Sequence, residues 1–367
     1  MSRTEWTLRA ASAFSVALLA GCAGKSTASD TPASTPAAST APATNDGDLP
    51  CLAGDSVKSL YSGVVTGLGI SSDQVVITSD RVLRVPLAGG DAVTLATPES
   101  PYGLLLLGDR AYFEASHPDG APVGAKQPTG ETLDSVPVTG GDASTALSED
   151  LAPSPFEGAS DADSMYFPAR SASSAVTRFT PPSTRTDLGL SGPSLLINAI
   201  AVFGSYVYVA GDDISGGGGL SNGLIVRVPK SGGDMQRLLT NIGHPWNLTV
   251  DASGLYWIQD PQQFEGGAQL MHSNLDGTES TNLLWTTINP VSVSSFAIGG
   301  DQIYFTEGDV VASIPVAGGP MTTIASGQNS PGMLTAAGQN VVWLAPASQA
   351  LSDPTVPQVF TACAPQR

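Results

Sequence analysis

Histidines and paired acids are the residues of this chain that could carry acid–base or metal chemistry. The chain has three histidines, His117, His244 and His272. None has the spacing of a zinc site and no Cys-x-x-Cys is present, so the sequence predicts no transition-metal centre. His117 falls in a Pro- and Gly-rich insertion and His272 inside a predicted strand. His244 precedes Pro245 at the junction of two repeats, where a side chain can face a ligand.

Two acidic pairs place carboxylates at short spacing. Turn chemistry explains Asp161 and Asp163 without any function. Asp212 and Asp213 fall in an insertion, 210–223. A glycosidase needs two carboxylates at a defined separation, and calcium needs several further oxygen ligands. We therefore predict no catalytic residue, no metal and no cofactor, with Ca²⁺ kept as the alternative.

The stretch Gly219-Leu-Ser-Asn-Gly223 matches the Gly-x-Ser-x-Gly pattern of a serine nucleophile. That chemistry needs a strained turn from a buried strand into a helix. This match continues a run of glycines and leads into a predicted strand, so it indicates a loop. Trp246 is either a core residue or a stacking platform for a ligand. The residues that we predict to face a ligand are His244, Trp246, Asp212 and Asp213.

Composition limits the classes of function. The 367 residues include 33 acidic and 15 basic side chains, a net charge of -18. Nucleic acid needs clustered Lys and Arg, so it is excluded as a partner. With 41 Gly, 28 Pro and no long apolar pattern of helical period beyond the N-terminus, the composition favours short strands joined by turns.

The N-terminus has the pattern of an export signal. A basic start at Arg3 and Arg9 precedes an apolar run that is too short to span a bilayer. Leu19-Ala-Gly-Cys22 resembles the lipobox of bacterial lipoproteins. The resemblance implies that 1–21 is a signal peptide, that Cys22 is lipidated, and that the protein is anchored in the cell envelope. Ala23 after the cysteine implies sorting to the outer membrane. The alternative to the lipobox is an ordinary secretory signal that contains a cysteine.

Residues 22–48 consist mostly of Ala, Ser, Thr, Pro, Gly and Asp, with no aromatic side chain. Such a segment cannot bury enough apolar surface to offset its chain entropy, so it predicts a disordered tether. Residues 49–367 then form a single domain.

A repeat runs through that domain. Its first mark is a polar turn followed by a β-branched or aromatic pair, and neighbouring marks are 36 (Asp73 to Asp109) to 54 residues (Asp109 to Asp163) apart. The seven copies are Asp73-Gln-Val-Val-Ile77, Asp109-Arg-Ala-Tyr-Phe113, Asp163-Ser-Met-Tyr-Phe167, Gly204-Ser-Tyr-Val-Tyr208, Ser253-Gly-Leu-Tyr-Trp257, Asp301-Gln-Ile-Tyr-Phe305 and Gln339-Asn-Val-Val-Trp343. A second mark, as in Arg84-Val-Pro-Leu-Ala-Gly-Gly90, follows most of them. This period and composition predict an all-β propeller of four-stranded antiparallel blades. A pair of sandwiches or a solenoid fits the spacing and the uniform signature less well.

The two ends of the domain complement each other. The seventh copy lacks a fourth strand, and Val57-Lys-Ser-Leu-Tyr61 is a strand without a hairpin before it. We therefore expect the N-terminal strand to complete the last blade. Cys51 and Cys363 flank those strands and predict a disulfide in an oxidising compartment. The alternative is two buried free thiols.

Two motifs carry a family resemblance. Leu255-Tyr-Trp-Ile-Gln-Asp260 with Asn274-Leu-Asp-Gly-Thr278 resembles the YWTD repeat of receptor propellers, and Val-Pro-x-x-Gly-Gly resembles the repeats of myxobacterial-type lipoproteins. The resemblance covers 52–363 and implies a fold. YWTD propellers usually have six blades, whereas seven first marks predict seven blades.

The sequence predicts a binding or protein-interaction module of the envelope, with no catalytic activity assigned. The insertions 115–132 and 210–223 and the inter-blade loops would form its contact surface for a protein or glycan. The alternatives are a hydrolase or lyase acting on glycans or peptides, and a structural component of an envelope complex. We expect the protein to contact the membrane through the lipid on Cys22.

Overall fold

The structure is a computed structural model. It describes residues 49–52, 56–116, 131–147, 158–169, 175–190, 194–215, 222–260, 267–283, 293–345 and 356–364. The chain divides into two units, Met1–Ser39 and Thr40–Arg367, and all described residues belong to the second. The predicted signal 1–21, the lipidation site Cys22 and the tether 22–48 lie outside the described residues and stay predictions. Within the described ranges, no helix is long and apolar enough to cross a membrane.

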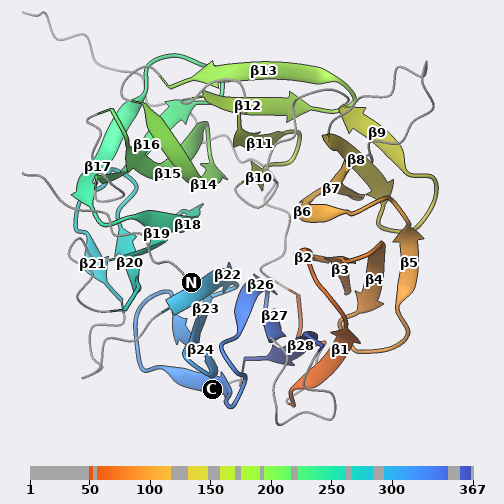
Figure 1. Cartoon of the computed structure of the whole chain (residues 1–367). Coiled ribbons are helices and arrows are strands. Elements are labelled where there is room, and N and C mark those ends of the chain that lie inside the picture. The colour runs from red at the N-terminus through yellow and green to blue at the C-terminus, as the bar shows by residue number, and fades with distance from the viewer. Residues whose placement is uncertain are drawn as a thin grey trace, which may run out of the picture. The chain divides into compact units, whose positions relative to one another are not determined.

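The second unit is a ring of seven four-stranded antiparallel sheets, which confirms the seven-bladed propeller (Figure 1). Blade 1 has β2 (Gly67–Ser71), β3 (Gln74–Thr78), β4 (Val82–Pro86) and β5 (Val93–Ala96). Blade 2 has β6 (Tyr102–Leu107), β7 (Arg110–Ser116), β8 (Glu131–Pro137) and β9 (Ser144–Leu147). Blade 3 has β10 (Ala159–Ser160), β11 (Met165–Pro168), β12 (Ala175–Thr180) and β13 (Thr184–Gly189).

The remaining blades follow the same order from the centre outward. Blade 4 has β14 (Leu195–Phe203), β15 (Tyr206–Asp213), β16 (Gly223–Pro229) and β17 (Gln236–Ile242). Blade 5 has β18 (Pro245–Asp251), β19 (Gly254–Gln259), β20 (Gln269–Ser273) and β21 (Thr281–Asn282). Blade 6 has β22 (Val293–Gly299), β23 (Gln302–Glu307), β24 (Val310–Pro315) and β25 (Thr322–Ala325). Blade 7 has β26 (Gly332–Ala337), β27 (Asn340–Ala345), β28 (Gln358–Cys363) and β1 (Lys58–Ser62).

The core is divided among the contacts between blades. The described residues form seven hydrophobic clusters, each of which joins two neighbouring blades. The second strand of a blade is packed on both faces, so it is apolar without interruption, as in Ile303-Tyr304-Phe305, where all three side chains are fully buried. This explains why each copy of the first mark contains a β-branched or aromatic pair, because that pair lies in the buried second strand of its blade.

The Val-Pro-x-x-Gly-Gly mark is the end of a third strand and its turn. Pro86 is the last residue of β4, and its carbonyl accepts a bond from the N–H of Gly89, whose φ is 89°. Because the proline closes the strand, its missing N–H costs the sheet nothing. Arg84 of the same mark donates to Val138 O in the next blade (3.0 Å), so the mark also joins blades.

The two ends of the blades differ. Turns such as Gly204-Ser205, which join first to second strands, lie at one end, which we call the turn face. The connections from second to third strands, and from one blade to the next, lie at the opposite end, which we call the loop face. The strand ends that flank both predicted insertions lie at the loop face, and most residues of the insertions lie outside the described ones. The strands extend into the predicted bounds, since β7 ends at Ser116, β8 begins at Glu131, β15 ends at Asp213 and β16 begins at Gly223.

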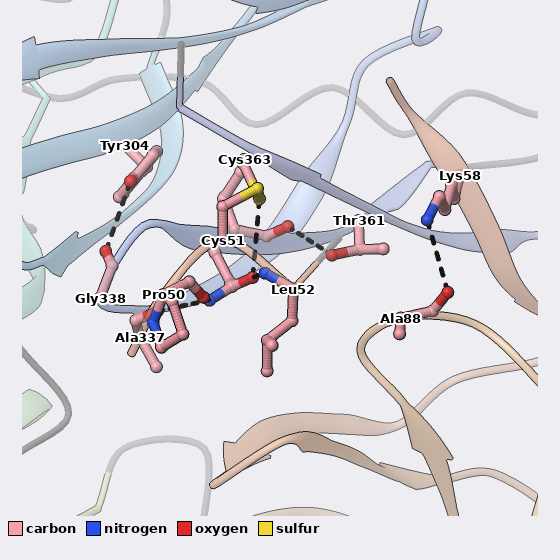
Figure 2. Close-up of a disulfide and its surroundings, with 12 residues drawn as sticks. Pro50, Cys51, Leu52, Lys58, Ala88, Tyr304, Ala337, Gly338, Thr361 and Cys363 are labelled. Atoms are coloured by element: carbon pink, nitrogen blue, oxygen red, sulfur yellow. Dashed lines mark hydrogen bonds between the residues drawn. A yellow bond between two sulfur atoms is a disulfide. The ribbon is translucent and has the colours of Figure 1, made fainter. Parts of the chain in front are cut away.

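The N-terminal strand closes the ring, as predicted. β1 pairs with β28 antiparallel, with Lys58 opposite Thr361. Cys51 and Cys363 form the predicted disulfide, with their Cα atoms 5.6 Å apart. Figure 2 shows Cys51 and its neighbours beside the turn that begins β27 at the turn face. There Asn340 donates to Pro50 O (2.8 Å) and accepts a bond from Leu52 N–H (2.9 Å).

Candidate functional site

Three elements bring polar side chains together at the loop face between blades 4 and 5. His244 lies in the connection from β17 to β18, Asp212 lies near the end of β15, and Asn198 lies in the inner strand β14. His244 Nδ1 is 2.6 Å from Asp212 Oδ2, and Asn198 Nδ2 donates to the same oxygen over 2.7 Å. The structure thus unites two of the predicted ligand-facing residues, which are 32 positions apart, with a third residue that the sequence reasoning missed.

A β-bulge aims the Asn198 side chain. Along β14 the pairing with β15 shifts between Ile197 and Ala199, which leaves Asn198 without an opposite residue. Bulges bend a strand and redirect the side chain of the extra residue. The amide of Asn198 consequently reaches both Asp212 and Pro245 O (3.0 Å), the carbonyl that opens the next inner strand.

The network assigns the proton between His244 and Asp212. The amide of Asn198 is a donor, so Asp212 Oδ2 acts as an acceptor and the proton of the His244 ring belongs on Nδ1. With its proton on Nδ1, His244 donates to Asp212 Oδ2, and the 3.4 Å contact between Nδ1 and the Asn198 amide joins two donors, so it is not a hydrogen bond. Within the described residues His244 makes no hydrogen bond through Nε2, which leaves that atom for another partner. Its side chain is 24% exposed, whereas that of Asp212 is 0% exposed.

Asp212 is buried at a cost. Its second oxygen, Oδ1, is buried and has no hydrogen-bond partner among the described residues. Leaving a buried polar atom unpaired costs about 1–3 kcal/mol, and more for a charged group. The sequence predicts that Asp212 faces a ligand, whereas in the structure its carboxylate is fully buried and contacts the imidazole of His244.

Trp246 and two apolar side chains adjoin the pair. The ring centroids of His244 and Trp246 are 5.8 Å apart, and Trp246 also packs partly against the cluster between blades 5 and 6. Trp246 thus belongs partly to the core and remains half-buried at the junction. Leu196 of β14 and Ile214 after β15 are 44% and 40% exposed at the same end of blade 4.

Asp213 is not part of the pair. It accepts bonds from the hydroxyl and N–H of Ser215 within its own turn, and these bonds lower the pKa of its carboxyl. Elsewhere on the loop face, burial raises the pKa of Glu307 at the end of β23. His272 lies toward the turn face, where its ring is 4.6 Å from the Tyr256 ring and Nε2 is 3.3 Å from Ser253 O.

The other candidates from the sequence lie outside the described residues or have a structural role. His117 and most of the Gly219–Gly223 match lie outside the described residues. Asp161 accepts bonds from the N–H groups of Asp163 and Ser164, so it is a turn residue as the sequence indicated. In the part of the chain that the structure describes, no group of three or more His, Cys, Asp or Glu side chains could hold a metal ion.

No protein-family model matches the chain, and no curated protein matches its sequence. Solved structures match it as a fold. A virginiamycin B lyase from Staphylococcus aureus is 13% identical with a TM-score of 0.56, covering 84% of this chain and 99% of its own. A catalytically inactive form of that lyase with quinupristin is 13% identical with a TM-score of 0.53, covering 83% and 98%. The likeness is one of fold alone.

A third neighbour shows a difference in closure. The propeller domain of the Trilobed protease from Pyrococcus furiosus is 11% identical with a TM-score of 0.60, covering 84% of this chain and 97% of its own. It is described as having an open velcro topology, whereas here β1 and a disulfide close the ring. Propellers of this kind thus include lyases and parts of peptidases.

Proposed function

We propose that this chain is a lipid-anchored envelope protein whose propeller binds a ligand at the loop face, over blades 4 and 5. The observation that carries the proposal is the pair of partly exposed rings, His244 and Trp246, with the exposed Leu196 and Ile214 at the same face. Apolar surface beside a few placed polar groups is what small-molecule and peptide sites offer. The ligand is a small molecule, peptide or glycan of the envelope.

The point where the chain enters the propeller supports this proposal. Residues 49–52 are bonded to the start of β27 at the turn face. A lipid on Cys22, which the Leu19-Ala-Gly-Cys22 sequence favours, would hold the propeller from the face opposite His244. The loop face then stays open to its ligand, and we propose the outer membrane as the site of anchoring.

Two other functions remain as alternatives. A structural component of an envelope complex would use blade faces rather than a ligand site. A hydrolase or lyase would use an acid–base group at the loop face, and the solved neighbours include lyases, one of them determined with quinupristin. The Asp212–His244 contact is the observation that favours the second alternative.

Capture from the envelope tests the binding proposal. The full-length protein, solubilised in mild detergent, would be immobilised through its C-terminus and exposed to envelope extract, and mass spectrometry would identify retained peptides, glycans and small molecules. We expect the double variant Trp246→Ser, Leu196→Ser to lose about tenfold or more of the retained ligand. The turn-face variant His272→Gln should retain it as the wild type does. Equal retention by all three proteins would refute the proposed surface.

A further inference from the structure

In three blades, the same kind of hydrogen bond joins the blade to the proline at the start of the inner strand of the next blade. In each, a polar side chain donates to the carbonyl of a proline. The donors and acceptors are Asn198 and Pro245 (3.0 Å), Thr66 and Pro101 (2.8 Å), and Ser294 and Pro331 (2.9 Å). This bond ties neighbouring blades together at the loop face, so it has a structural role wherever it occurs.

The surroundings of this bond differ between blade 4 and blades 1 and 6. In blades 1 and 6 the donor hydroxyl lies beside a second hydroxyl, that of Thr78 (3.2 Å) or Thr306 (2.8 Å). In blade 4 the corresponding partner of the donor is the carboxylate of Asp212, which is 0% exposed. A carboxylate costs more to bury than a hydroxyl. Since neutral hydroxyls suffice in two blades, the structural bond alone does not account for Asp212.

The residue before the proline differs in the same way. Ser100 and Ser330 precede Pro101 and Pro331, whereas His244 occupies that place before Pro245. Asp212 and His244 thus replace neutral side chains together, and they contact each other over 2.6 Å. A buried carboxylate that accepts Nδ1–H fixes the tautomer and orientation of a histidine and stabilises its protonated form.

We propose that Asp212 and His244 form an acid–base pair, in which His244 Nε2 removes a proton from the ligand bound at the loop face. The proposal rests on the proposed binding site, because the ligand must present an acidic C–H to Nε2. His244 is the catalytic residue, and Asp212 and Asn198 are positioning residues. The site would then catalyse an elimination.

The reaction needs no further reagent. Nε2 takes the proton, the C–H electron pair becomes a carbon–carbon double bond, and the bond to a leaving group breaks. The leaving group departs with its electron pair and receives the proton back from Nε2. Throughout, the Nδ1–H of the imidazolium stays bonded to Asp212. Within the described residues, no serine, threonine or cysteine side chain bonds to His244, so a covalent route through a nucleophile has no candidate there.

The base can be tested with 5-nitrobenzisoxazole, whose ring opens when one base removes its single ring C–H proton. We expect the full-length protein to open this probe faster than imidazole at equal concentration and pH. The variant His244→Gln should lose about 10²-fold or more of that rate, the usual contribution of a general base. His272→Gln is the matched control, because His272 is also partly exposed but lies at the other face, and its rate should equal that of the wild type. A rate that His244→Gln leaves unchanged, or no rate above imidazole, overturns the proposal.

A second variant separates catalysis from folding. Asp212→Asn keeps the shape of the side chain but presents either an amide or a carbonyl to Nδ1, so it should lower the rate at least tenfold. Nitrogen-15 NMR of the imidazole should show the proton on Nδ1 in the wild type and a changed tautomer ratio in Asp212→Asn. An Nε2–H tautomer in the wild type overturns the assignment, as does an unchanged rate in a folded Asp212→Asn variant. If His244→Gln still captures the envelope ligand but no longer opens the probe, both the binding proposal and the catalytic proposal are supported. If the wild type captures the ligand but does not open the probe, only the catalytic proposal is refuted.

Discussion

Replacing Cys51 and Cys363 with serine opens a covalent loop that spans almost the whole propeller. The disulfide joins residues 312 positions apart. With ΔS ≈ −2.1 − 1.5R ln n, a loop of that length corresponds to about 5.7 kcal/mol at 25 °C. The pairing of β1 with β28 and the bonds of Asn340 to Pro50 and Leu52 need no sulfur, so part of the closure survives. We therefore expect the free energy of unfolding to fall by about 3–5 kcal/mol.

The assay is urea unfolding followed by tryptophan fluorescence, with hydrogen exchange measured on β1 and β28. Asn340→Ala is the matched control, because it removes the bonds to Pro50 and Leu52 while the disulfide stays intact. It should cost about 1–3 kcal/mol, because it removes two hydrogen bonds that contribute about 0.5–1.5 kcal/mol each. Faster exchange in β1 should appear in the cysteine variant at urea concentrations below the main transition.

A different result would refute this reasoning. If the cysteine variant loses less than about 1 kcal/mol and β1 exchanges no faster, strand pairing alone closes the ring and the loop-entropy argument fails. A larger effect of Asn340→Ala than of the cysteine variant would place the closure in the hydrogen bonds.

Two further predictions concern the ion pair between blades 3 and 4 and the anchor. Burial raises the pKa of Asp161, but the bonds from Lys230 Nζ (2.7 Å) and from the N–H groups of Asp163 and Ser164 outweigh it, so the pKa lies below its ordinary value of 3.8. A carboxyl whose pKa is lowered in the folded state stabilises the fold at pH values above the unfolded pKa, and this contribution is lost as the pH falls through the folded pKa. Lys230→Met should therefore have a lower melting temperature than the wild type at pH 7, and the difference should shrink below pH 3.8. A difference in melting temperature that stays constant with pH would contradict the charge argument. Cys22→Ser should move the protein from the detergent phase to the aqueous phase in a phase-partition assay, and unchanged partition would contradict lipidation.

The repeat could be predicted from the sequence because its signals are local. The pair Tyr304-Phe305 follows a turn at Gly300-Asp301, and both its side chains are fully buried in β23. Short turns and continuous apolar strands leave a record within a few residues. The disulfide was predictable for a similar reason. In the sequence the seventh repeat lacks a fourth strand, which the strand at 57–61 can supply, and Cys51 and Cys363 flank the two strands that would pair.

The site could be predicted only in part, because it depends on how strands meet. Gly211-Asp212-Asp213 has the composition of a loop, but it is the end of β15. Gly211 is needed there because a Cβ would lie 2.3 Å from Leu196 O, so only glycine admits the neighbouring inner strand. The bulge at Asn198 depends on the register between β14 and β15, which no short motif specifies. His244 and Trp246 were identified from their junction, but their partner Asn198 was not.

The disulfide also determines how the propeller bears mechanical load. A pull on the N-terminal segment first loads the bonds of Leu49 and Pro50 to the start of β27, and at Cys51 it passes through sulfur to Cys363 in β28. β1 lies beyond Cys51 along the chain, so the disulfide gives the load a path that bypasses the pairing of β1 with β28. Without the bond, the same pull would peel β1 from β28 one residue pair at a time, starting near Lys58 and Thr361. Because residues 51 to 363 form one covalent loop, a force on the N-terminal segment is shared between the disulfide and the hydrogen bonds that close the last blade.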